Sequence, residues 1–227
     1  MLSVRTPRLF RTEDTRAPVR RAVALAAQAW QLRRLPPRVA FFYVRALLTA
    51  LRARDQWTLY TGTRPRELAR LLELAGDEDR VAEVGTGTGC TAIALALARR
   101  DRQVLTLDSE QRPERDRYLR LVGQRTRERI EFRRQRGEEG PPAGAGQFGL
   151  VFVDSSHELE ETTATFAAWE PAVARGGAVA FHDYGDPLYP GVEGAIRRLG
   201  LRGAREGSLY VWRKSAASGA AAQGASL

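Results

Sequence analysis

The sequence is poor in several residue types, and each scarcity narrows what the chain can be. Cysteine occurs once in 227 residues, so no disulfide forms within the chain, and a reducing compartment, the cytoplasm, is expected. No apolar run approaches the roughly 18 residues that a membrane-spanning helix needs, which predicts a soluble protein with no membrane partner. No internal repeat is visible.

Lysine is almost absent, although the chain is strongly basic. All but one of the 36 basic residues are arginine, and the formal net charge is +9. Residues 1–57 hold twelve arginines and three acids, which accounts for the whole excess, and the remaining residues are balanced. We therefore expect an Arg-rich extension at 1–57, a separate domain at 58–214 and a disordered tail, rich in Ala, Ser and Gly, at 215–227.

The extension is expected to be helical. Apolar periodicity predicts one helix over 17–35, which Pro36 and Pro37 end, and a more apolar helix over 39–51. These helices form either a cap over the following domain or the surface of a homodimer. The Arg-rich start of the chain, free of acids until Glu13, is also compatible with a transit peptide.

The most informative segment is the run from Glu83 to Gly89, which reads Glu-Val-Gly-Thr-Gly-Thr-Gly. A short apolar stretch precedes it, and an Ala/Leu-rich stretch typical of a helix follows at 90–98. A glycine turn between a strand and a helix presents bare backbone N–H groups to a ligand. A turn that serves only strand–helix packing is the alternative.

The spacing of the glycines excludes two common nucleotide sites. Cys90 stands where a dinucleotide fingerprint needs a third glycine or alanine, and no Gly-Lys-Ser/Thr follows, which excludes a Walker phosphate loop. Glu83, two places before the first glycine, would repel a pyrophosphate but help to hold an ammonium group. Cys90 itself either has a lowered thiol pKa at a helix start or is a small packing residue.

This run resembles motif I of the class I methyltransferases, which bind S-adenosylmethionine, a ligand with an amino acid end and no phosphate. The resemblance rests on Glu83, Gly85, Gly87 and Gly89, and with the later motifs it covers roughly residues 58–213. It implies that these residues and Thr86 line a pocket for S-adenosylmethionine.

The order of elements after residue 65 predicts the fold. Helices are expected at 66–74, 90–98, 113–124, 158–173 and 192–199. Strands are expected at 80–84, 103–107, 130–134, 148–153 and 177–181, with a closing antiparallel hairpin at 201–204 and 209–212 and a Gly/Pro-rich loop at 139–147. Alternating strands and helices predict an α/β fold, a Rossmann-like doubly wound sheet that is mostly parallel, with the N-terminal helices as a cap.

Four of the five parallel strands end at or beside a carboxylate: Asp108, Glu138, Asp154 and Asp183. Ligands of open α/β sheets bind at the carboxyl ends of the strands. Solvated loop ends also gather polar residues, so the set as a whole, rather than any one member, indicates a site.

Two of these acids are expected to contact the cofactor's nucleoside. Asp108 ends the second strand, and a carboxylate there accepts both ribose hydroxyls in related folds; Ser109 follows it in the same pocket. The resemblance places Glu138 beside the adenine ring. An ordinary loop acid is an equally good interpretation of Glu138.

The segment from Asp154 to His157 predicts a reaction centre. It resembles the metal-dependent small-molecule O-methyltransferases of the catechol and macrolide-sugar type, which place a metal-binding Asp at the end of the fourth strand with a basic residue close behind. A histidine near a helix N-terminus has its cationic form disfavoured, so we expect His157 to be a neutral base. A helix-capping surface histidine is the alternative.

The fifth strand ends in His182 and Asp183, which completes a candidate metal site. Neighbouring strands lie about 4.8 Å apart, so Asp154 and Asp183 can share one divalent cation, with Mg²⁺ as the ion of the related enzymes. His182 suits magnesium poorly and favours a softer metal, or none. The expected catalytic residues are thus Asp154, His157 and Asp183, and Asp154 also borders the cofactor.

The sequence as a whole predicts transfer of a methyl group from S-adenosylmethionine to a hydroxyl of a small molecule. Two other functions stay open. The acceptor can be RNA or a carrier-bound substrate docked on the Arg-rich helices, although no nucleic-acid motif is present there. The chain can also be a cofactor-binding subunit without catalysis, although it retains the polar residues of the centre.

Overall fold

The structure, a computed structural model, describes residues 30–216. Most of the helix expected at 17–35, the first residues of the chain and nearly all of the tail expected at 215–227 lie outside the described residues. Within residues 30–216, no helix is both long enough and apolar enough to cross a membrane.

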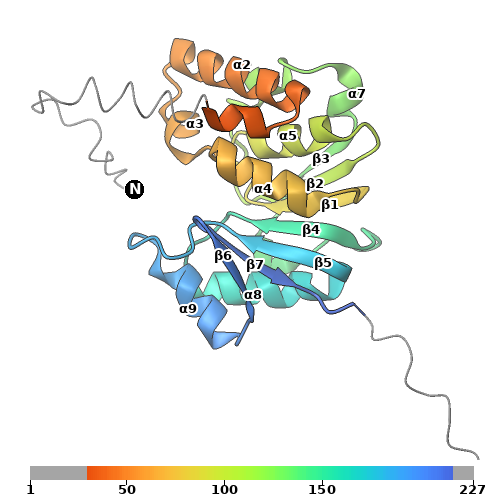
Figure 1. Ribbon diagram of the computed structural model, residues 1–227, viewed down its shortest axis with the longest axis vertical. Helices are drawn as coiled ribbons and strands as arrows, with labels where there is room; N and C mark the ends of the chain where they lie inside the picture. The colour runs from red at the N-terminus through yellow and green to blue at the C-terminus, as the bar shows by residue number, and fades with distance from the viewer. Residues whose placement is uncertain (1–29, 217–227) are drawn as a thin grey trace, which may run out of the picture.

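A seven-stranded sheet forms the middle layer of the molecule (Figure 1). Its order is β3-β2-β1-β4-β5-β7-β6; the first five are parallel, β7 runs antiparallel to β5, and β6 antiparallel to β7. The strands are β1 (Arg80–Val84), β2 (Gln103–Asp108), β3 (Ile130–Arg134), β4 (Phe148–Val153), β5 (Val173–Phe181), β6 (Gly203–Glu206) and β7 (Leu209–Arg213). The predicted doubly wound sheet with its antiparallel hairpin is confirmed.

Helices cover both faces of the sheet (Figure 1). One face carries α2 (Pro37–Ala53), α3 (Gln56–Thr61), α4 (Pro65–Ala75) and α5 (Cys90–Ala98), and the other carries α8 (Leu159–Trp169) and α9 (Pro190–Arg198). The short elements are η2 (Leu32–Arg34), α6 (Arg115–Leu119), α7 (Gln124–Arg127), η3 (Gly137–Glu139) and η4 (Glu170–Ala172). The chain therefore has three layers, as expected of a doubly wound fold.

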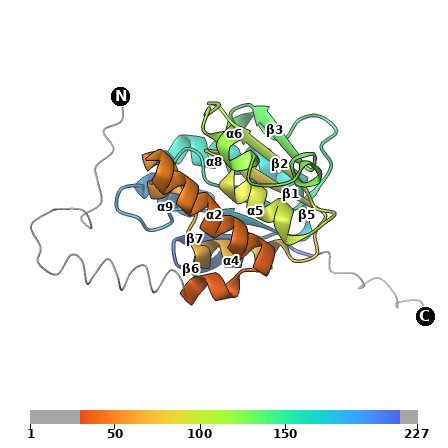
Figure 2. The ribbon, with the colours of Figure 1, turned by 90° about the horizontal axis from the view of Figure 1, so that it is seen from above.

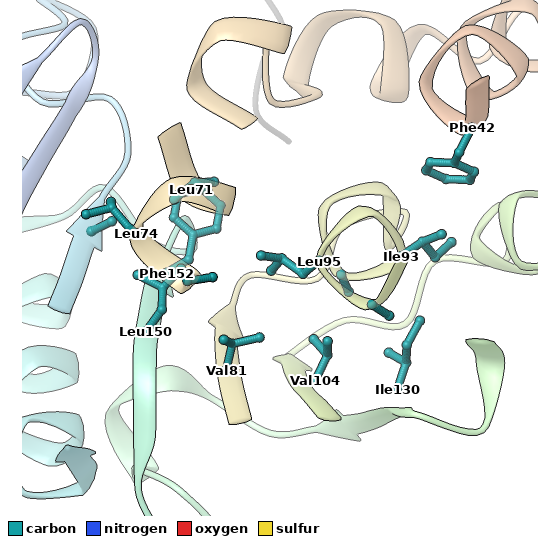
Figure 3. Close-up of a cluster of buried hydrophobic side chains, with 14 of the residues drawn as sticks. Phe42, Leu71, Leu74, Val81, Ile93, Leu95, Val104, Ile130, Leu150 and Phe152 are labelled. Carbon is teal, nitrogen blue, oxygen red and sulfur yellow. The ribbon is translucent and has the colours of Figure 1, made fainter. Parts of the chain in front are cut away.

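Side-chain alternation along the strands divides the core into two halves. On the first face, strand residues such as Val81 and Leu150 pack under α4 and α5, and Phe42 of α2 reaches the same cluster (Figure 3). On the second face, Val84 and its neighbours pack against α8 and α9, around the fully buried Trp169. Successive residues of a strand point to opposite faces, so both faces of this sheet are apolar.

Helix α2 packs directly on α5, as Figure 2 shows from above. Its inner residues are buried in the core clusters, namely Val39, Phe42, Ala46 and Ala50. Its outer face bears exposed apolar side chains at a spacing of three and four residues: Phe41, Val44, Leu48 and Leu51. The expected boundary between residues 57 and 58 falls within α3, and the domain division and the homodimer stay predictions.

Several elements differ from the expectation, and three differences are the largest. The helix expected at 113–124 is limited to α6, which ends at Leu119, and α7 begins only at Gln124, after Gly123. The helix expected to end at residue 173 ends at Trp169, and η4, which contains Pro171, leads into a β5 that begins at residue 173. Helix α3 was not predicted; it begins where Asp55 accepts a hydrogen bond from Thr58 N at 3.1 Å.

Candidate active site

The glycine turn after β1 lies against the end of β4. Gly85 has a φ of +106°, and a Cβ there would be 1.9 Å from the carbonyl oxygen of Asp154. Gly87 and Gly89 also adopt positive φ, and Gly89 is the N-cap of α5. Only glycine permits this approach. The glycine turn, which is the candidate cofactor loop, is therefore in direct contact with Asp154, the first residue of the candidate reaction centre.

The structure brings Asp108 to the same turn. Its Oδ2 accepts a hydrogen bond from Gly87 N at 2.9 Å, and its Oδ1 accepts one from Glu110 N at 3.0 Å. A carboxylate has about four acceptor sites, so both oxygens keep capacity for ligand hydroxyls. Ser109 is next in the chain, and its carbonyl accepts a hydrogen bond from Arg134 Nε at 3.3 Å.

Glu83 is a buried acid without a basic partner. Its side chain is 2% exposed, and Oε2 accepts a hydrogen bond from Thr106 Oγ1 at 2.5 Å, which in turn lies 2.7 Å from Thr86 Oγ1. Burial, and then the charges of Asp154 and Asp108, raise the pKa of Glu83 well above its usual value. No basic side chain of residues 30–216 forms an ion pair with it. A carboxylate in this position favours a cationic ligand.

Glu138 has a partner that the sequence did not predict. It lies in η3 and forms an ion pair with Arg136, with Nε and Oε1 2.5 Å apart. The preceding Gly137 packs so closely that a Cβ there would lie 2.6 Å from Val84 Cγ1. The turn is therefore fixed by packing, and contact between Glu138 and an adenine ring stays a prediction.

Four polar side chains meet where β4 and β5 end. His157 Nε2 lies 3.0 Å from Asp183 Oδ2 and 3.8 Å from Asp154 Oδ1. His182 Nδ1 lies 3.1 Å from Asp154 Oδ1 and 3.3 Å from Asp183 Oδ1. The predicted catalytic and metal-binding residues thus form one cluster, which we call the strand-end cluster (Asp154, His157, His182 and Asp183).

Part of the strand-end cluster has the donor arrangement of a metal site. One ligand atom each from Asp154, His182 and Asp183 lies within 4.8 Å of the others. Two nitrogens of the cluster, His157 Nε2 and His182 Nδ1, are buried and have no hydrogen bond of acceptable geometry within the described chain. Buried nitrogens that lack a hydrogen-bond partner and face two carboxylates are consistent with a site that binds a cation.

Asp183 occupies a backbone conformation that L-residues seldom adopt. Its φ is +54°, and Arg54 is the only other non-glycine residue with positive φ in residues 30–216. Such strain costs roughly 1–2 kcal/mol and concentrates at functional sites. The conformation turns the Asp183 carboxylate toward both histidines.

The electrostatics of the strand-end cluster contradict one expectation. Burial alone would lower the pKa of His157, but the neighbouring carboxylates of Asp154 and Asp183 outweigh it and raise this pKa to about 9. The expected neutral imidazole is therefore wrong for the metal-free protein, because two acids lie within 4 Å of the ring. Burial opposes the same carboxylates at His182, whose pKa is also raised.

Sequence reasoning missed two residues that contact the strand-end cluster. Glu67, on α4, is 8% exposed, and its Oε2 lies 3.4 Å from His182 Nε2. Tyr189, in the loop before α9, stacks on His157 with ring centroids 4.1 Å apart. Glu67 is 115 residues from His182 in the chain, so no local motif signals it.

A third missed group lies over the glycine turn. Thr58 Oγ1 is 2.9 Å from Thr88 Oγ1, and a Cβ on Gly87 would lie 3.5 Å from Trp57 Nε1. The Arg112 guanidinium stacks on the Trp57 ring at 3.4 Å. Helix α3 therefore places an aromatic side chain beside the candidate cofactor loop.

The lone cysteine is a packing residue. Burial raises the pKa of the Cys90 thiol to about 12, so the alternative of a lowered thiol pKa is wrong. Cys90 packs against the core on the α5 side of the sheet.

Comparison with known proteins gives one family match, over the central part of the chain. A family model described as a methyltransferase domain matches residues 82–184, a span that includes the glycine turn, Asp108 and the strand-end cluster. A comparison of the sequence with curated proteins gave no match.

Solved structures share the fold at low sequence identity. The chain resembles cofactor-bound Rv0187 from MTB at 23% identity and a TM-score of 0.59, over 75% of this chain and 89% of that one. It resembles the O-methyltransferase TomG from Streptomyces achromogenes, in complex with SAM, at 18% identity and a TM-score of 0.57, over 74% and 88%. It also resembles CalS11, a TDP-rhamnose 3'-O-methyltransferase in calicheamicin biosynthesis, at 16% identity and a TM-score of 0.55, over 92% of this chain and 99% of that one. These likenesses confirm the predicted fold.

Proposed function

We propose that this chain transfers a methyl group from S-adenosylmethionine to a hydroxyl of a small, natural-product type molecule, a proposal supported by the match of a methyltransferase-domain model to residues 82–184. One observation supports this most strongly. The glycine turn and the strand-end cluster are in backbone contact through Gly85 and Asp154, so a donor bound at the turn meets an acceptor bound at the cluster.

The proposed cofactor pocket follows the glycine turn. Glu83, buried and without a basic partner, balances the ammonium group of the methionine end. Asp108, held by Gly87 N–H, accepts the ribose hydroxyls, with Ser109 and Glu138 toward the adenine. The reaction needs little chemistry from the protein, because the sulfonium is already an activated donor and alignment supplies much of the rate.

The proposed acceptor site is the strand-end cluster. The acceptor hydroxyl must lose a proton as the O–CH₃ bond forms and the sulfonium C–S bond breaks. His157 Nε2 is the atom proposed to accept that proton, since it is buried without an aligned hydrogen bond. It accepts in the neutral form of the imidazole, whose share grows as pH rises toward the raised pKa of about 9. Tyr189, stacked on the His157 ring, holds its plane and excludes water from it.

A divalent metal ion is proposed as part of this site, held by Asp154, His182 and Asp183. The residues fit, because their ligand atoms converge within 4.8 Å and His182 Nδ1 is a buried orphan. When bound, such an ion acts as a Lewis acid that lowers the pKa of the acceptor hydroxyl.

The experiment incubates the full chain with methyl-labelled S-adenosylmethionine and a panel of hydroxyl acceptors, including catechols and nucleotide-linked sugars. We expect label in an O-methyl product. His157→Ala should lower kcat by about 10²–10⁴-fold, the usual contribution of a positioned proton acceptor, and leave the S-adenosylmethionine Kd within about twofold. Unchanged turnover would remove His157 from this role.

A matched variant tests the cofactor pocket separately. Asp108→Asn should weaken S-adenosylmethionine binding by about tenfold, since one charge-assisted hydrogen bond is lost. Tight cofactor binding with no transfer to any acceptor would favour the non-catalytic subunit. Transfer to RNA or a carrier protein that falls steeply with added salt would favour a macromolecular acceptor.

A further inference from the structure

Glu67 is held from three sides beside the strand-end cluster. Its Oε2 accepts a hydrogen bond from Arg64 N at 3.0 Å, and its Oε1 accepts one from Ser208 Oγ at 2.5 Å. His182 Nε2 lies 3.4 Å from Oε2. Helix α4, the loop before β7 and the end of β5 therefore converge on one nearly buried carboxylate.

This contact decides which nitrogen of His182 keeps its proton. An ionised carboxylate only accepts hydrogen bonds, so Nε2 must carry the hydrogen that points at Glu67. Nδ1 is then the nitrogen that faces Asp154 and Asp183, and it is buried without an aligned hydrogen bond. A cation bound at Nδ1 takes the place of a proton there, while Nε2 keeps its own.

In many metalloproteins a carboxylate accepts a hydrogen bond from an imidazole, and the other nitrogen of that imidazole binds the metal. A histidine that binds a metal almost always donates its other N–H to a carboxylate or carbonyl, which fixes the ring and raises its basicity. Glu67 and His182 form the outer two members of such a chain, and Asp154 and Asp183 supply the oxygen ligands. One imidazole among the ligands favours a borderline transition ion over magnesium, which prefers oxygen only.

We propose that Glu67 is a positioning residue that fixes His182 as an Nδ1 ligand, and that the centre selects a first-row transition ion such as Mn²⁺ or Co²⁺ over Mg²⁺. This rests on the metal in the proposed function and adds the ion class and the residue that selects it. Glu67 itself does not touch the ion.

The test measures metal binding directly on the full chain, without acceptor. Titration calorimetry should give a lower Kd for Co²⁺ and Mn²⁺ than for Mg²⁺. Pulsed electron paramagnetic resonance of bound Mn²⁺ should show coupling to one ligand ¹⁴N, which His182→Ala abolishes. Glu67→Ala should raise the Co²⁺ Kd by about 10- to 100-fold, the usual effect of losing such a partner.

Matched variants separate positioning from folding. Glu139→Ala removes the other capping-box glutamate of the described chain, which accepts a hydrogen bond from Arg136 N at 2.9 Å on an exposed turn, and should leave the Co²⁺ Kd unchanged. Ser208→Ala removes one support of Glu67 and should raise this Kd several-fold, even if Glu67→Ala fails to fold.

Two results would overturn the inference. The first is a wild-type protein that binds Mg²⁺ at least as tightly as Co²⁺, or binds neither. The second is a Co²⁺ Kd and a ¹⁴N coupling that are the same in wild type, Glu67→Ala and Ser208→Ala. Methyl transfer measured with a chelator present keeps the proposals apart: transfer that persists without metal leaves the methyltransferase activity in place, even where the binding experiments overturn the metal centre.

Discussion

Replacing Glu83 by glutamine should stabilise the ligand-free protein and weaken cofactor binding at the same time. Glu83 is buried beneath the glycine turn, its carboxylate accepts a hydrogen bond from Thr106, and Asp154 and Asp108 repel its charge. A buried charged group that lacks its full set of partners costs on the order of 1–3 kcal/mol. Glutamine removes the charge and keeps an oxygen for Thr106.

The stability gain should depend on pH in one direction. The pKa of Glu83 is raised in the folded protein. Its contribution to the free energy of unfolding is therefore at its maximum below the unfolded-state pKa of about 4.3, and it is lost as pH rises through the folded-state pKa. Glu83→Gln should therefore match wild type near pH 4 and exceed it at pH 8. Each kcal/mol corresponds to a Tm increase of about 2–4 °C in a chain of this size.

The free energy of cofactor binding that Glu83→Gln loses should be larger than the free energy of unfolding that it gains. A hydrogen bond to a charged group contributes about 1.5–3 kcal/mol, so Glu83→Gln should raise the S-adenosylmethionine Kd by roughly 10- to 100-fold. Thermal unfolding and titration calorimetry measure the two effects. Glu131→Gln, at an exposed acid paired with Arg133 on β3, is the control and should change neither. A variant that melts lower than wild type at pH 8, or binds the cofactor equally well, would refute the reasoning.

Two further substitutions test the glycine turn. Gly85→Ala should destabilise the protein by about 3 kcal/mol or more, measured by urea unfolding, because its Cβ has no room. Gly144 also has a positive φ, +77°, but no neighbour within 4 Å, so Gly144→Ala should cost only about 1–2 kcal/mol. Equal losses would contradict the packing argument. Trp57→Ala should raise the S-adenosylmethionine Kd about tenfold. Trp30→Ala, at an exposed Trp–Arg pair, is the control and should not change this Kd. Equal Kd values in both variants would show that Trp57 does not contact the cofactor.

The sequence predicted the site best where local pattern and strand order suffice. Glycine spacing identified the turn around Gly85 and Gly87, and the carboxyl ends of parallel strands must share an edge, so Asp154 and Asp183 could be placed together. Element ends were harder. The helix expected at 113–124 ends at Leu119, and the end of α8 depends on how the chain turns into β5.

The residues that the sequence missed depend on tertiary contact. Glu67 reaches His182 only because α4 packs against β4, which is the neighbour of β5 in the sheet, and lies beside the loop before β7. Trp57 reaches the glycine turn only because α3 is anchored there by Thr58. The protonation of His157 was predicted from its helix, but the nearby acids Asp154 and Asp183 decide it, and their distance from the ring has no signature in the sequence.

The left-handed backbone of Asp183 restricts which sequences this protein can explore. Glycine adopts that conformation freely, asparagine and aspartate adopt it more readily than most other L-residues, and a replacement for the Asp183 carboxylate must supply a side-chain oxygen as ligand. The two conditions together leave aspartate and asparagine. A saturation library at this position, selected for activity, should therefore return only aspartate and asparagine, whereas selection for folding alone should also return glycine.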